Sequence, residues 1–385
     1  MPLNPPTSTP SKSHSSQPQG SSGVHQKELK RRMSKELSNQ VWSFSPERIA
    51  DMLRPSENPE PREDAINTAV EIFTTKLDSN PYTPSYTAPE RDYYNFVAYI
   101  LNACVASCLK VVTEHGIVPP GVDPLYALLR FITWGKPMAD SVDGAEALQP
   151  DLAGINALSP DSPTQLYWSL AQENTHKRRI ILPVEIKSHT PALVAQAATY
   201  ARGLNSTAPL RAFELVLGYN YSCDEFRLFI FHRGGLTSSN AISLRGDSDR
   251  AALVRMFMSI MSWTDEGDAG YPSFTNGQQF IIPDPSNSTR SVSVTVDEVL
   301  YHAQGLRSRN TWVAHLAHNT PTAGRNLPAT TVAVRRRYQP NGDSQTPSRS
   351  TPPTPSTPRT QSSTGMATRL RSATKSTSTS TAPGM

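Results

Sequence analysis

Hydrophobic positions in the first part of the chain recur at helical spacing. Residues 45–54 and 61–77 follow this pattern, and Ile66, Ala69, Val70 and Phe73 share one face of the second segment. Residues 90–113 give the strongest helical pattern. Two prolines at 119–120 then interrupt the chain, and a shorter helix is predicted near 123–130.

The periodicity changes in the second half. Residues 178–189 form an apolar run typical of a buried strand, and a helix is predicted from Pro191 to an end at Gly203. Two β-rich runs, 213–221 and 225–234, predict a hairpin whose turn lies at Asn220–Asp224. A helix follows over 247–263, with Asp247 as its N-cap. This order predicts an α/β (α+β) fold with a mixed central sheet flanked by helices.

The two ends of the chain differ from its middle. Residues 1–40 and 321–385 are rich in Ser, Thr and Pro, so we predict disordered tails around one folded domain over 41–320. Of the formal net charge of +4, residues 1–35 carry about +5 and residues 335–385 about +7, which leaves about −8 for the middle. The folded part is therefore acidic, and its bulk charge does not favour nucleic-acid binding. Thr-Pro steps in the C-terminal tail are candidate phosphorylation sites.

Three cysteines and the absence of a secretory signal favour an intracellular protein of the nucleus or cytoplasm. Cys104 and Cys108 share one helical face, where core packing explains them better than a metal site. We find no apolar run of transmembrane length and expect no membrane partner.

Candidate chemistry gathers around the predicted buried strand. Glu185 and Lys187 alternate with Ile186, so both point to one face of the sheet, and Asp151 precedes a second apolar run. Two carboxylates together suit a hard divalent cation such as Mg²⁺ or Mn²⁺, and a nearby lysine suits phosphodiester hydrolysis. Gln196 and Tyr200 are four residues apart on the next helix, so they can face the same site. The alternative is a partly buried salt bridge without a metal.

This arrangement resembles the PD-(D/E)xK phosphodiesterase superfamily, and the QxxxY element is similar to that of its RecB-type branch. The resemblance implies that Asp151 and Glu185 are metal ligands, that Lys187 is the catalytic lysine, and that Gln196 and Tyr200 form the helix motif. Glu90 is the candidate for the acidic residue that this superfamily carries on a helix.

A second resemblance covers roughly residues 130–275. The blocks LPVEIKSH, QAATYAR, RLFIFHRGGLTSS and MSWTDEGDAGYPSF are similar, in this order, to the N-terminal region of the fungal-type protein kinases of basidiomycetes. The HRD and DFG motifs of a kinase module do not occur in the sequence. We therefore interpret the chain as a non-catalytic regulatory or binding module with an unknown protein or nucleic-acid partner. The alternatives are a Mg²⁺-dependent nuclease and, less favoured, an active protein kinase.

Overall fold

A computed structural model describes most of the predicted folded region and short segments beyond it. The described residues are 22–80, 83–85, 87–140, 148–156, 163–168, 179–272, 275–276, 279–284, 287–302, 311–318 and 330–335. The Thr-Pro steps of the C-terminal tail lie outside these residues.

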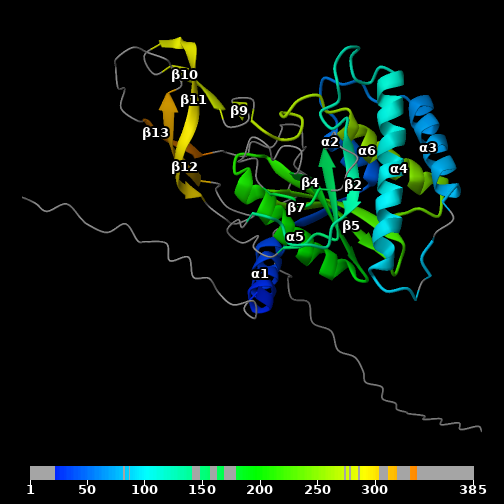
Figure 1. Cartoon of the computed structure of the whole chain (residues 1–385). Helices are drawn as coiled ribbons and strands as arrows, with labels where there is room; N and C mark the ends of the chain where they lie inside the picture. The colour runs from blue at the N-terminus through cyan, green and yellow to red at the C-terminus, as the bar shows by residue number, and fades with distance from the viewer. Residues whose placement is uncertain are drawn as a thin grey trace, which may run out of the picture. The chain divides into compact units, whose positions relative to one another are not determined.

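The centre of the fold is a mixed sheet with the strand order β1-β7-β6-β5-β4-β3-β2, and β8 pairs with β6 (Figure 1). The pairs β4–β5 and β1–β7 are parallel, whereas the other pairs are antiparallel. The strands are β1 (Val41–Phe44), β2 (Leu129–Thr133), β3 (Leu152–Asn156), β4 (Ile180–Lys187), β5 (Phe213–Asn220), β6 (Glu225–His232), β7 (Gly235–Ser239) and β8 (Ile242–Ser243). The predicted mixed α/β fold is confirmed.

Helices cover both faces of this sheet (Figure 1). One face packs against α2 (Pro46–Leu53), α3 (Glu63–Asp78), α4 (Asp92–Glu114) and α6 (Asp247–Met261). The other face packs against α1 (Ser22–Leu37) and α5 (Thr190–Thr207). Central strands covered on both sides become almost continuously apolar, which explains the run in β4 that marked this strand in the sequence.

A second, antiparallel sheet has the order β13-β12-β11-β10-β9. Its strands are β9 (Thr275–Asn276), β10 (Gln279–Asp284), β11 (Asn287–His302), β12 (Thr311–His318) and β13 (Thr330–Arg335). The sequence did not predict this sheet, and β13 lies inside the C-terminal tail that was predicted to be disordered over 321–385.

The N-terminal tail also differs from its prediction. Residues 1–40 were predicted to be disordered, but α1 occupies 22–37 and buries Met33 and Leu37. Leu29, Met33 and Leu37 form one apolar stripe at a spacing of four residues. The many charged residues between them made this helical pattern hard to recognise in the sequence. The ordered region therefore begins before residue 41.

Three local predictions also need correction. Residues 125–128 form a turn rather than a helix, and β2 starts at Leu129, where pairing with β3 fixes an extended backbone. Helix α5 runs past Gly203 to Thr207 and ends before Pro209, a residue that restricts its predecessor to extended conformations. The N-cap of α6 is Gly246, and Asp247 lies in its first turn.

Helix α4 is long and apolar enough to span a membrane by length and composition alone, contrary to our expectation from the sequence. Most of it is buried inside the fold, and Val97, Leu101, Cys104 and Cys108 are fully enclosed. This pattern is typical of the core helix of a globular domain. The core-packing explanation of the two cysteines fits this position.

Candidate functional site

The residues Asp151, Glu185 and Lys187 meet at one end of the central sheet. Asp151 immediately precedes β3, which pairs antiparallel with β4 so that Leu152 lies opposite Val184. The backbone N–H of Ile186 donates to Asp151 Oδ2 at 2.8 Å, which holds the carboxylate beside the strand. Ile186 itself is buried on the α4 side, as the alternation of side chains predicted.

The ammonium of Lys187 lies among three carboxylates. Its Nζ is 2.8 Å from Glu90 Oε1, 2.9 Å from Glu185 Oε1 and 3.5 Å from Asp151 Oδ2. It also donates to the backbone carbonyl of Ile186 at 2.8 Å. We call these four side chains, Glu90, Asp151, Glu185 and Lys187, the carboxylate–lysine cluster.

Helix α5 supplies the two residues that the sequence placed on one helical face. The Tyr200 hydroxyl lies 2.6 Å from Glu185 Oε2 and 2.8 Å from the Gln149 carbonyl oxygen, and Gln196 hydrogen bonds to the same hydroxyl. Gln196 and Tyr200 are both buried. The structure thus brings all five predicted site residues together.

Helix α4 and the segment just before it add two side chains, Tyr94 and Glu90. Glu90 was a candidate from the sequence, whereas Tyr94 was missed. The Tyr94 hydroxyl donates to Asp151 Oδ1 at 2.5 Å and lies 3.4 Å from Glu90 Oε1. Glu90 and Tyr94 are four residues apart, the same spacing that identified Gln196 and Tyr200, so this signal was present in the sequence.

Burial governs the electrostatics of the cluster. Loss of solvent and the nearby charge of Asp151 raise the pKa of Glu185 from 4.5 to about 8, although Lys187 and Tyr200 oppose this shift. Burial lowers the pKa of Lys187, but the attraction of Glu185 and Asp151 outweighs it and the net shift is upward. Burial and Asp151 also raise the pKa of Tyr94. Lys187 therefore stays charged, and Glu185 titrates closer to neutral pH than an ordinary carboxyl group.

A divalent cation does not fit the cluster in this arrangement. Both oxygens of Asp151 and both of Glu185 already lie beside hydrogen-bond donors, and the Lys187 ammonium lies between the two groups. Among the described residues, no group of three or more His, Cys, Asp or Glu side chains is arranged to hold a metal ion. The roles of Asp151 and Glu185 as Mg²⁺ or Mn²⁺ ligands stay a prediction.

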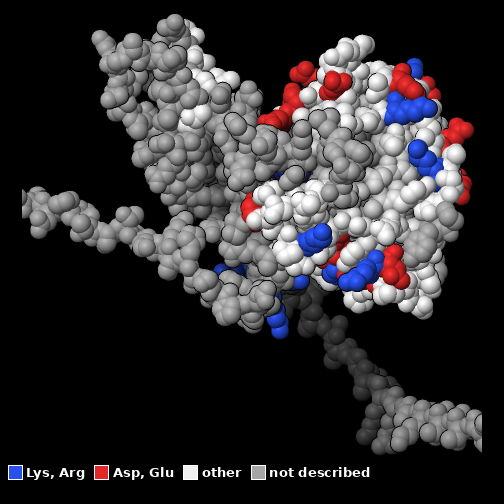
Figure 2. Space-filling view, in the orientation of Figure 1, with Lys and Arg blue, Asp and Glu red and all other residues white. Residues whose placement is uncertain are grey.

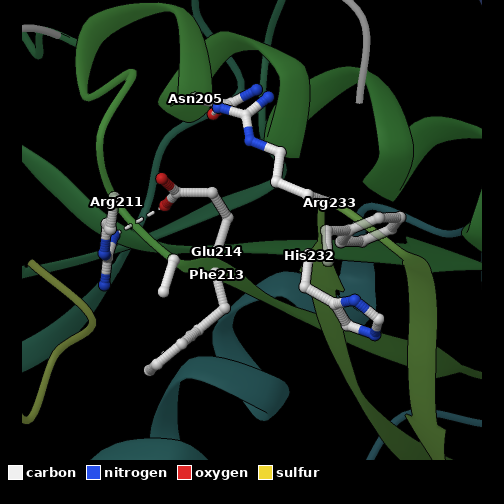
Figure 3. Close-up of a pocket in the computed structure, with 8 residues that line it drawn as sticks. Asn205, Arg211, Phe213, Glu214, His232 and Arg233 are labelled. Atoms are coloured by element: carbon white, nitrogen blue, oxygen red, sulfur yellow. Dashed lines mark hydrogen bonds and ion pairs between the residues drawn. The ribbon is translucent and has the colours of Figure 1, made fainter. Parts of the chain in front are cut away.

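A second buried ion pair lies at the start of β5. Arg211 Nη1 is 2.6 Å from Glu214 Oε2, and both side chains are almost fully enclosed. They line a small pocket with Asn205 and Arg233, in which Glu214 Oε1 is buried without a hydrogen-bond partner (Figure 3). The pocket has room for about one water molecule, which could satisfy that oxygen, so we assign it a structural role.

Three other polar side chains, His189, His232 and Asp265, lie outside the cluster. The His189 side chain is exposed and makes no capping bond at the start of α5. His232 stacks on Trp42 and bonds to Thr237. Asp265 accepts hydrogen bonds from the N–H groups of Gly267 and Asp268, so the acidic loop after Trp263 is held by its own backbone.

Residues 165–326 match the family model described as fungal protein kinase. The match includes Glu185, Lys187, Gln196 and Tyr200, whereas Asp151 and Glu90 precede it. The similarity to fungal protein kinases expected from the sequence blocks is therefore confirmed over this segment. No curated protein matches the chain.

Proposed function

We propose that this chain is a non-catalytic regulatory or binding module related to the fungal protein kinases. In this proposal the carboxylate–lysine cluster is a structural ion-pair network. It ties the ends of β3 and β4 to α4 on one side of the sheet and to α5 on the other. The strand–strand–helix order, with Asp before β3, ExK in β4 and QxxxY in α5, supports a core derived from a PD-(D/E)xK fold.

The observation that carries the proposal is the position of the Lys187 ammonium. It lies 2.8–3.5 Å from Glu90, Asp151 and Glu185, so a protein cation occupies the space between the carboxylates. Removing two carboxylates from water is costly unless each is paired and hydrogen bonded. The donors Lys187, Tyr94, Tyr200 and the Ile186 N–H meet that requirement without a metal.

One observation favours the alternative, a Mg²⁺-dependent nuclease. Three carboxylates face one ammonium, so acidic groups outnumber the basic group in the cluster. Lys187 and Glu90 are also partly exposed, with 26% and 32% of their side chains accessible, which leaves a route from solvent. An active protein kinase is not favoured, because the HRD and DFG motifs do not occur in this sequence.

A nuclease assay separates the two proposals. We expect the chain to cleave neither single-stranded nor double-stranded DNA or RNA in the presence of Mg²⁺ or Mn²⁺. The Asp151→Ala variant should give the same background. Metal-dependent cleavage that disappears in Asp151→Ala, but persists in the surface variant Lys76→Ala, would establish the nuclease instead.

A further inference from the structure

Helix α1 carries an apolar stripe and a separate stripe of basic side chains. Leu29, Met33 and Leu37 pack into the core on the α5 side of the sheet. Lys27, Arg31 and Lys35 recur at the same spacing of four residues, and all three are exposed. At a rise of about 1.5 Å per residue, such cations follow one another at intervals of about 6 Å along the helix.

The charge of α1 is unbalanced. Residues 27–37 hold five Lys and Arg side chains against Glu28 and Glu36, which gives +3 on a protein whose folded middle is acidic. In Figure 2 blue basic atoms lie on α1, whereas blue and red lie side by side over α3 and α4. We call Lys27, Arg31 and Lys35 the basic row.

We propose that the basic row binds the phosphodiester backbone of a nucleic acid. A regular row of cations matches a repeating anion better than it matches a single carboxylate, and Lys and Arg are the residues that make such contacts. An anionic membrane is a poorer partner, because an interfacial helix needs an apolar face to insert, and the apolar face of α1 is buried in the core. The proposal is independent of the proposed function, since no residue of the carboxylate–lysine cluster takes part.

Glu28 competes for this surface from within the helix. It lies 2.8 Å from Arg31 Nε and 3.0 Å from Arg32 Nε. The hydrogen bonds of these two guanidinium groups hold the pKa of Glu28 at about 2, so it stays ionised. A phosphate that binds Arg31 must displace this carboxylate, and Glu28 therefore weakens the interaction.

The surface offers phosphate contacts without base recognition. Trp42 is the nearest exposed aromatic residue along the chain, but it pairs with Thr237 in the β1–β7 register. Since Leu236 faces the α1 side and side chains alternate along a strand, Trp42 lies on the opposite face of the sheet. Bases are not expected to stack on it, so binding should not depend on sequence.

Fluorescence anisotropy of a labelled single-stranded DNA and its duplex, titrated with the full chain at several salt concentrations, tests the proposal. The triple variant Lys27→Ala/Arg31→Ala/Lys35→Ala should lose about tenfold in affinity at low salt. The slope of the logarithm of the association constant against the logarithm of the salt concentration should decrease in magnitude by about 2 to 3. Each lost phosphate contact removes about 0.7 to 0.9 from this slope. Glu28→Gln should change both quantities in the opposite direction.

A control variant with the same change in net charge is Arg62→Ala/Lys76→Ala/Lys110→Ala, whose side chains are exposed on or beside α3 and α4. It should retain the affinity and slope of the natural chain, which separates the basic row from a general effect of net charge. Equal losses in both triple variants would overturn the proposal. Equal affinity for polyglutamate of matched charge would also overturn it, in favour of an acidic protein partner. Thermal unfolding confirms that each variant folds.

Discussion

At the scale of single residues, the protonation state of Glu185 depends strongly on its surroundings. Only 3% of its side chain is exposed, and it faces Asp151, Lys187 and Tyr200. The sequence predicted Asp151, Glu185, Lys187, Gln196 and Tyr200 as neighbours, because strand alternation and helical spacing fix directions. It did not predict that Lys187 would be enclosed by acids, because Tyr94 on α4 and Glu90 just before this helix lie far from Asp151 in the sequence.

The raised pKa of Glu185 has a consequence for stability. Between pH 4.5 and about 8 the folded chain holds this proton while the unfolded chain releases it. The contribution of Glu185 to the free energy of unfolding is thus fully present below pH 4.5. It falls by up to about 1.4 kcal/mol per pH unit as pH rises toward 8. We expect Glu185→Gln, which cannot titrate, to lose this slope in urea unfolding measured across that range.

The comparison isolates Glu185, because Glu214 and His232 titrate in the natural chain and in the variant alike. Glu71→Gln on the exposed face of α3 is the matched control and should follow the natural profile. A Glu185→Gln profile parallel to that of the natural chain would show that Glu185 is already ionised in the folded state.

At the scale of elements, patterns of sufficient length were predictable. Helix α4, strand β4 and the β5–β6 hairpin follow from periodicity and apolar runs, since each buries a continuous surface. The prediction of a helix over 123–130 was wrong, because this segment is too short to form a stable helix without packing. The pairing of Leu129 with Asn156 places its end in the sheet instead. Helix α1 was not predicted, because the polar composition of residues 1–40 favoured a prediction of disorder. Its three apolar positions were too few to change that prediction.

Helix α1 should contribute to the stability of the whole domain. Met33 is 2% exposed and packs in the core beside α5. Truncating a buried methionine costs about 2–5 kcal/mol, so Met33→Ala should lower the free energy of unfolding by at least about 2 kcal/mol in urea denaturation. Ser34→Ala, one position along on the exposed side, should have little effect. No difference between the two variants would mean that α1 is not docked in solution.

At the scale of the whole molecule, the net charge differs between the middle of the chain and its two ends. The acidic middle forms the mixed sheet with helices on both faces, and excess positive charge gathers at α1 and in the C-terminal region. The order of the predicted helices and strands was enough to predict a mixed central sheet flanked by helices. It was not enough to predict the second sheet, although Ser291–Val296 in β11 alternates polar and apolar residues as a half-buried strand does.

The central claim is that the Lys187 ammonium takes the place of a divalent cation between Asp151 and Glu185. The most direct test is the thermal unfolding midpoint with and without Mn²⁺, measured for the natural chain and for Lys187→Met, which keeps the apolar stem and removes the charge. A ligand that binds only the folded state raises this midpoint. We predict no rise for the natural chain and a Mn²⁺-dependent rise for Lys187→Met. A rise for the natural chain that the variant lacks would contradict the claim and favour the metal-dependent enzyme.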